Sequence, residues 1–269
     1  MNLLRLMWSF VRRDAMIAMS YRTAFFTPVV SIFIAVPVFH FVASVFAGAD
    51  VPALGAYQGS VFAFLLLGIA VQDYVTLSIS TFLSGIREHQ LMGTMEIVML
   101  SPTPVPLILL FSSIWGYLFT SLRFALYILL GLAFGLDLSG ANMFSFLLLA
   151  LTAIVSFAAI GILGAAATLI IKQGASITAL LTAATLALGG VAYPLSVLPG
   201  WLQIVSLMLP FTHALLGVRK ALLLGATPAD LSLELLVLGA FGLVLFPISL
   251  WVFQLALRRV KVTGTLGQY

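Results

Sequence analysis

The sequence predicts an all-α integral membrane protein, and two observations predict it: the composition and the spacing of apolar stretches. Hydrophobic residues make up 62% of the 269 residues, and charged residues only 7%. A soluble domain carries roughly 25% charged residues, so this chain could not cover a water-facing surface. Apolar stretches of about 20 residues, which cross a hydrocarbon core as a helix, recur along the chain. We therefore expect one membrane domain, residues 1–269, with six transmembrane helices.

The expected spans follow the apolar stretches in order. They cover residues 24–46, 59–83, 105–134, 143–171, 174–192 and 233–257. Small residues within them, such as the Gly131–Gly135 pair and the Gly161–Gly164 pair, permit close helix approach, and core packing is their expected role.

Residues 2–20 have the pattern of a helix that lies in the membrane interface. The apolar face holds Leu4, Met7, Trp8, Val11 and Ala15, and the polar face holds Arg5, Ser9 and Arg12. The basic region of a signal peptide has a similar pattern, but no convincing cleavage site follows and six spans do.

The distribution of Lys and Arg predicts that both termini are cytoplasmic. On that orientation the cytoplasmic side holds Arg5, Arg12, Arg13, Arg22, Arg87, Lys172, Arg258, Arg259 and Lys261. The outer side holds only Arg219 and Lys220, which would either bind a lipid phosphate or snorkel to the headgroups.

Two charges fall inside expected spans, Asp73 in the second and Arg123 in the third. An isolated charge at the bilayer centre costs at least ~2.5–3.5 kcal/mol, so each should face a partner or a wet cavity. The expected span limits place their backbones roughly 10 Å apart in depth. Two interpretations are therefore open: a buried tie between neighbouring helices, or a role in lining a substrate route.

The segment between the second and third spans is longer than a minimal connection requires. Residues 87–99 suit a short helix parallel to the membrane, ended by Pro102 and Pro104. A solvated amphipathic loop is the alternative.

Residues 193–232, between the fifth and sixth spans, are neither a plain loop nor a plain span. Prolines break the apolar pieces at Pro194, Pro199 and Pro210. Short re-entrant helices in the outer leaflet fit these pieces, with Tyr193 and Trp201 as aromatic anchors. An ordinary extracellular loop is the alternative.

With both segments in place, the chain resembles the permeases of type-2 ATP-binding-cassette (ABC) exporters over nearly its whole length. Arg87 to Pro102 is similar to that family's Arg…Gly-Thr-(apolar)-Glu…(Ser/Thr)-Pro signature. Gly190 to Arg219 is similar to its Gly…Pro…Leu-Pro-x-Trp-Leu…Pro…Arg signature. His213 departs from the family pattern, which commonly has tyrosine there.

The resemblance implies that residues 87–99 contain a coupling helix that docks on a cytoplasmic ATPase subunit. The residues assigned to coupling are Arg87, Glu88, Leu91, Gly93, Thr94, Met95 and Glu96. Arg87, Glu88 and Glu96 would form charge-assisted bonds to this partner, and Leu91, Met95 and Met99 would form an apolar face. The residues assigned to the re-entrant motif are Gly190, Pro194, Leu198, Pro199, Trp201, Pro210 and Arg219.

The expected function is that of the membrane-spanning subunit of an ATP-driven exporter in the plasma membrane of a bacterium or archaeon. The chain has no G-x-x-x-x-G-K-[S/T] motif, so it is not expected to be an enzyme. It would bind no cofactor, since two copies of a separate ATPase subunit would use ATP and Mg. A second copy of this permease, or a homologous permease, would complete the pathway among the membrane lipids.

The Gly93–Glu96 segment is closer to the drug and lipid branch of the family than to its polysaccharide branch, which predicts a hydrophobic or amphipathic cargo. Phe62, Phe64 and Phe82 would suit a cargo that enters from the bilayer. The alternatives are a polysaccharide or glycolipid exporter and, from another class, a transporter driven by an ion gradient.

Nucleic-acid binding, thiol chemistry and metal binding are not expected. The basic residues are scattered between spans, the chain has no cysteine, and its histidines have no metal-ligand spacing.

Overall fold

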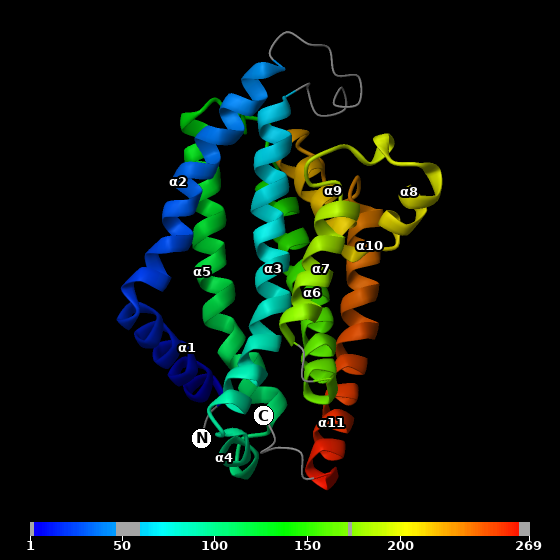
Figure 1. Ribbon diagram of the computed structural model, residues 1–269. Coiled ribbons are helices and arrows are strands. Elements are labelled where there is room, and N and C mark those ends of the chain that lie inside the picture. Colours follow the sequence, from blue (N-terminus) through cyan, green and yellow to red (C-terminus); the bar gives the residue numbers. More distant parts are fainter. Residues whose placement is uncertain (1–2, 47–59, 172–173, 264–269) are drawn as a thin grey trace.

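The computed structural model describes residues 3–46, 60–171 and 174–263, and every regular element in these ranges is a helix. Long helices run side by side, with α8 and α9 in the upper part of Figure 1 and α4 at the bottom. We call these the α9 end and the α4 end. The elements are α1 (Leu3–Ser20), α2 (Arg22–Val45), α3 (Val61–Leu91), α4 (Met95–Leu100), α5 (Val105–Ala133), α6 (Met143–Ile171), α7 (Gly174–Leu188), η2 (Leu195–Val197), α8 (Gly200–Leu207), α9 (Pro210–Leu223), α10 (Ser232–Ala240), the π-helical η3 (Phe241–Leu245) and α11 (Phe246–Thr263).

Five of the described helices are long and apolar enough to cross a bilayer: α2, α3, α5, α6 and the continuous helix Ser232–Val262 formed by α10, η3 and α11. They correspond to the expected spans 24–46, 59–83, 105–134, 143–171 and 233–257. Two of them extend further than expected, α3 to Leu91 and α11 to Thr263. The protein is therefore an all-α, multi-pass membrane protein. Outside the described residues lie positions 47–59, which include the expected start of the second span at residue 59, and the pair Lys172–Gln173.

The expected fifth span, 174–192, is wrong at its end, because α7 stops at Leu188 after 15 residues, about 22 Å. Two glycines explain the stop. Gly190 adopts a φ of 73°, a left-handed conformation that ends helices. A Cβ on Gly189 would lie only 1.8 Å from the ring of Phe211, so glycine is required for α9 to pack there. The end of α7 is thus set by the approach of α9.

Helix α6 lies at the centre and packs on α3, α9 and α11. Glycines make this approach possible, since a Cβ at Gly161 would lie 2.3 Å from the Ser78 carbonyl oxygen and one at Gly164 would lie 2.6 Å from Leu83. On α5, a Cβ at Gly131 would lie 2.4 Å from Leu66. These contacts confirm core packing as the role of Gly131, Gly161 and Gly164. The expectation was wrong for Gly135, which follows the end of α5 with a φ of 91° and has no atom within 4 Å of the place where a Cβ would lie.

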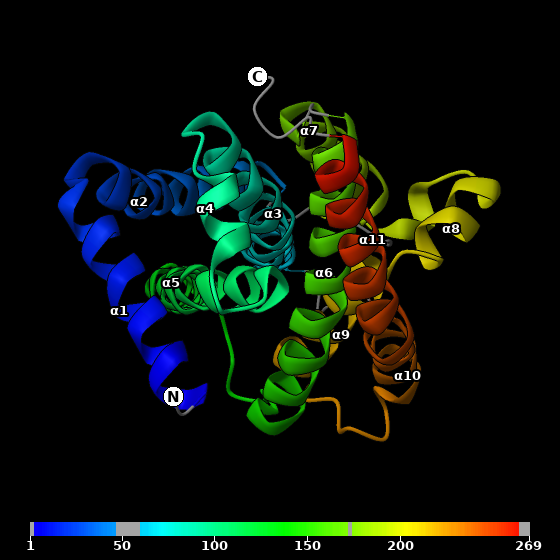
Figure 2. The same ribbon diagram turned by 90° about the horizontal axis from the view of Figure 1, so that it is seen from below.

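The region 193–232 folds into η2, α8 and α9 rather than an open loop. Helices α8 and α9 are both apolar and meet at 87°, as in a broken span or a re-entrant loop. Nearly every side chain of α9 is buried, whereas Trp201 on α8 is exposed. The hydroxyl of Tyr193 donates to the Ala187 carbonyl at the end of α7. The region therefore packs α9 into the bundle and leaves α8 at its surface (Figure 2).

Candidate functional site

Helix α3 is 31 residues long, about 46 Å, whereas a hydrocarbon core is about 30 Å thick. Its last turns therefore extend past the expected membrane boundary at residue 83. Arg87 and Glu88 lie on this extension and not on a separate short helix. The expected coupling helix 87–99 is thus wrong in its limits, because the chain turns only after Leu91.

Gly93 is the reason for the turn. It adopts a φ of 64°, and the N–H of Met92 bonds back to the Glu88 carbonyl over 2.9 Å, which closes the last turn of α3. The Thr94 hydroxyl lies 3.1 Å from Nδ1 of His89, which ties the start of α4 to the end of α3. The result is a sharp corner, residues 87–100, at the α4 end of the bundle, and we call it the α3–α4 corner (Figure 1).

Apolar side chains are exposed on this corner. The exposed fractions are 65% for Leu91, 65% for Met92, 70% for Ile97 and 86% for Leu100. The prediction that Met99 belongs to this face is wrong. Met99 is partly buried and, with Val98, packs on the protein's own core. The side chains of Met95 and Glu96 lie outside the described part of the structure. The corner therefore has the composition of a docking surface: exposed apolar side chains beside the exposed Glu88.

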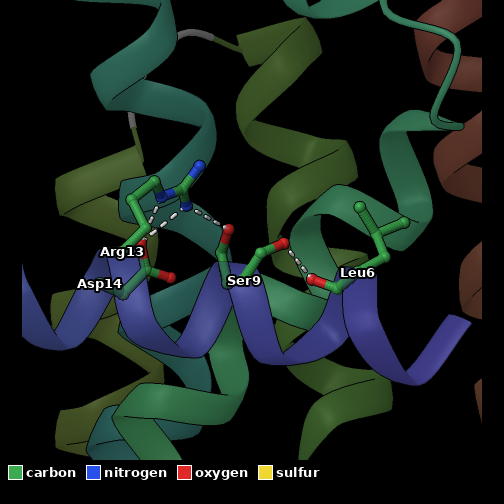
Figure 3. Close-up of polar contacts among 5 residues, drawn as sticks. Leu6, Ser9, Arg13 and Asp14 are labelled. Atoms are coloured by element: carbon green, nitrogen blue, oxygen red, sulfur yellow. Dashed lines mark hydrogen bonds and ion pairs between the residues drawn. The ribbon is translucent and has the colours of Figure 1, made fainter. Parts of the chain in front are cut away.

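Helix α1 packs obliquely against α5 near the same end (Figure 1). Figure 3 shows its polar contacts: Arg13 pairs with Asp14 at 2.7 Å, and the Ser9 hydroxyl donates to the Leu6 carbonyl over 2.6 Å. Arg13 also donates to the Ser112 hydroxyl on α5 over 3.0 Å. Arg13 therefore joins α1 to the base of α5.

Arg219 is the least expected feature of the re-entrant motif. It was expected at the outer headgroups, in contact with a lipid phosphate or snorkelling, but it is only 2% exposed. Its Nη1 donates to the Gly190 carbonyl over 2.8 Å, and its Nη2 donates to the carbonyls of Val191 at 2.9 Å and Phe64 at 2.8 Å. Its guanidinium carbon lies 3.4 Å from the centre of the Phe64 ring. Arg219 thus binds α9 to both α3 and the end of α7, and we call this arrangement the Arg219 clamp.

The clamp follows from unsatisfied backbone groups. Gly190 and Val191 lie beyond Leu188, the last residue of α7, so no helical N–H bonds to their carbonyls. A buried guanidinium supplies several donors at fixed angles and therefore replaces the missing bonds. Gly68 gives the clamp its space, since a Cβ there would lie 2.4 Å from the Val191 oxygen and 2.9 Å from Nη2 of Arg219.

The next residue, Lys220, pairs with Glu234 at the start of α10, with Nζ 2.7 Å from Oε1. Glu234 is buried, so this pair fixes α9 to α10 in a partly desolvated place. In the turn before α10, the hydroxyl and the N–H of Thr227 both donate to Asp230, which lowers the pKa of that carboxyl. Helix α9 is therefore held at the α9 end by ionic as well as apolar contacts.

Asp73 and Arg123 form an ion pair, with Nη2 of Arg123 2.6 Å from Oδ2 of Asp73. The pair joins α3 to α5. Asp73 lies 18 residues before the end of α3 at Leu91, and Arg123 lies 18 residues after the start of α5 at Val105. The depth difference expected from the sequence therefore disappears once α3 is given its observed length.

The phenylalanines that were expected to face a cargo do not face the bilayer. Phe62, Phe64 and Phe82 are all buried in the core, at 7%, 2% and 1% exposed. Helix α3 lies inside the bundle, so its phenylalanines pack on neighbouring helices. The expectation that these three side chains meet a cargo entering from the bilayer is therefore wrong.

The remaining residues of the predicted re-entrant motif are spread along the chain from the end of α7 to α9. Pro194 and Pro199 precede η2 and α8, and Pro210 begins α9, where its lack of an N–H is tolerated. The Leu198 carbonyl accepts a bond of 2.8 Å from the Gln203 side chain. His213, the departure from the family pattern, lies with Nε2 2.8 Å from the Leu207 carbonyl and joins α9 to α8.

The sequence was compared with models of protein families. The family model described as "ABC-2 type transporter" matches residues 5–223, from α1 to the last residue of α9. The matched range includes the α3–α4 corner, the Asp73–Arg123 pair and the Arg219 clamp. Comparison with curated proteins finds no match.

Proposed function

Because this chain belongs to the ABC-2 type transporter family, we propose that it is the membrane-spanning subunit of an ATP-driven exporter. In this proposal a separate ATPase subunit binds and hydrolyses ATP with Mg. Two permease subunits, two copies of this chain or one copy and a homologue, together form the path for a hydrophobic or amphipathic cargo.

The observation that carries the proposal is the α3–α4 corner. Its exposed apolar side chains lie at the end of a helix that runs unbroken through the bundle, so a push on the corner moves α3 along its whole length. Helix α3 in turn packs on α2, α5, α6, α7 and α9. A partner that docks on the corner and changes shape during ATP hydrolysis is therefore mechanically connected to most of the helices.

The proposed orientation places the α4 end in the cytoplasm. Helices α1 and α4 and the last turns of α11 lie at this end (Figure 1). The basic residues Arg258, Arg259 and Lys261 are on that last part of α11. An excess of Lys and Arg marks the cytoplasmic side of a membrane protein, which supports this orientation.

Co-purification tests the proposal. The tagged chain is expressed in turn with each candidate ATPase subunit from the same genome, extracted in mild detergent and isolated. We expect one ATPase to remain bound and the complex to hydrolyse ATP. Failure of every ATPase to bind, together with transport that stops when the proton gradient is dissipated, would instead favour an ion-gradient transporter.

The cargo is tested separately, by asking which compound accumulates in cells that lack both subunits. Accumulation of a polysaccharide precursor would contradict the amphipathic cargo.

A further inference from the structure

A cavity of about 530 Å³ lies within the single chain, between α5 and α6. Its back wall is formed by α3 and α9, through residues such as Val71 and Val218. The volume falls within the roughly 300–1,000 Å³ of small-molecule sites. We call it the lateral cavity.

The mouth of the lateral cavity opens sideways, toward the place where membrane lipid lies. Leu129 on α5 and Leu147 and Leu151 on α6 line it, and they are 61%, 58% and 64% exposed. Both helices are among the five that are long and apolar enough to cross a bilayer. The rim is therefore hydrocarbon-facing, and the molecules that can reach it are those dissolved in the bilayer.

The two hydroxyls that line the cavity, those of Tyr74 and Ser121, leave no free hydrogen-bond donor. Tyr74 and Ser121 hydrogen-bond with each other, and the Ser121 hydroxyl also donates to the Tyr117 carbonyl over 2.8 Å. The rest of the lining is aliphatic or phenylalanine, with Phe124 and Phe146 stacked at 5.3 Å between ring centres. The Asp73–Arg123 pair is not part of the lining. A polar headgroup would lose its hydrogen bonds here, so the occupant must be apolar along the length that enters.

We propose that the lateral cavity binds one acyl chain of a bilayer phospholipid, whose headgroup stays outside at the membrane surface. An acyl chain gains nothing from the hydrophobic effect when it moves from bilayer to cavity, because both are equally apolar. The acyl chain instead gains dispersion contacts with the side chains of the cavity wall, which would otherwise face empty space. Water does not compete, because an apolar cavity of this kind stays dry. The surrounding lipid is also present at the highest possible concentration, so a weak preference is enough for occupancy.

Photo-crosslinking of the purified chain tests this site. The protein is reconstituted in phosphatidylethanolamine and phosphatidylglycerol vesicles that contain phosphatidylethanolamine with a diazirine near the end of one acyl chain. After illumination, mass spectrometry locates the lipid adducts on peptides. We expect adducts concentrated on cavity residues such as Ile128 and Ile154. A matched lipid with the diazirine on its headgroup should give none there.

Variants then separate the cavity from the general lipid surface. Ala150 lines the cavity, and Ala150→Phe should lower adducts at Ile128 and Ile154 roughly ten-fold, because the added ring occupies the space. Ala240, at the end of α10, is exposed and does not line the cavity, so Ala240→Phe should change nothing. If Ala150→Phe does not fold, Ala125→Phe at the more exposed side of the same cavity serves in its place.

Three results would overturn the proposal. The first is adducts spread evenly over all lipid-facing helices, and the second is equal labelling of Ile128 and Ile154 in wild type and the filled variant. The third is loss of the cavity adducts when an assembled complex hydrolyses ATP, which would identify a cargo in transit and not a resident lipid. None of these results depends on which ATPase the chain binds, so the site can fail while the proposed function stands.

Discussion

Arg219 on α9 donates a hydrogen bond of 2.8 Å to the backbone carbonyl of Phe64 on α3, and its guanidinium lies 3.4 Å from the Phe64 ring centre. The same side chain binds the carbonyls of Gly190 and Val191, which follow α7. Three segments that are far apart in the sequence therefore meet at one arginine. The position of the short, buried helix α9 depends on it.

Replacing Arg219 should destabilise the fold strongly. Arg219→Met leaves three buried carbonyls without these donors, and the expected loss is about 3–5 kcal/mol of unfolding free energy. Arg219→Lys should lose less unfolding free energy, because an ammonium keeps the charge. Some loss remains, because the ammonium lacks the planar fork of donors. Thermal unfolding of the purified proteins in detergent measures both. Equal melting temperatures for wild type and Arg219→Met would show that the clamp does not hold α9.

Gly68 should tolerate no side chain. A Cβ there would lie 2.4 Å from the Val191 oxygen, so Gly68→Ala must displace the backbone or the clamp, at a cost of about 1–3 kcal/mol. Gly85 on the same helix provides the control, because a Cβ there meets nothing nearer than 3.7 Å. Gly85→Ala should be neutral or stabilise α3 by up to about 1 kcal/mol. The same unfolding assay compares the two, and similar losses in both would mean that helix α3 is sensitive to alanine for some other reason.

The Asp73–Arg123 pair should act as a tie between α3 and α5. Asp73→Asn leaves Arg123 charged without its partner inside the membrane, at a cost of at least ~2.5–3.5 kcal/mol, and should lower the yield of folded protein. The double variant Asp73→Asn, Arg123→Gln removes both charges and should recover most of the yield. Size-exclusion chromatography of each variant measures this. Normal folding of Asp73→Asn with lost transport would instead assign the pair to the substrate route.

Exposed apolar residues of the α3–α4 corner should determine ATPase binding. Leu91→Asp and Ile97→Asp put charge on side chains that are 65% and 70% exposed, so the permease should fold normally but lose roughly ten-fold or more in ATPase affinity. Val262 on α11 is 88% exposed and lies off the corner, so Val262→Asp should bind as wild type. Pull-down with the purified ATPase gives the comparison. Comparable losses in all three variants would remove the corner as the docking site.

Hydropathy alone predicted most of the bundle, because each span is a local property of about 20 residues. The limits of α6, Met143–Ile171, agree with expectation. The limits of α3 do not, since hydropathy ends the span at the first polar residues whereas the helix continues until Gly93 stops it. Gly93 was visible in the sequence as a helix breaker, and using it would have placed Asp73 and Arg123 at one depth.

The Arg219 clamp could not be predicted in the same way. Its partners are backbone carbonyls, which every residue has, and they come from positions 64, 190 and 191. A charge at residue 219 in an otherwise apolar helix indicates only that something must neutralise or solvate it. The lateral cavity is equally hidden, because it depends on how α5 and α6 separate over α3 and α9.

The central claim is that movement of the α3–α4 corner by an ATPase drives export. The most direct measurement is transport in proteoliposomes that contain the chain, its co-purified ATPase and a fluorescent amphipathic lipid as cargo, with the proton gradient dissipated throughout. The account predicts movement of the cargo that requires ATP and stops when Leu91→Asp prevents docking. Movement that continues without ATP, or that is unaffected by Leu91→Asp while ATP is hydrolysed, would contradict it.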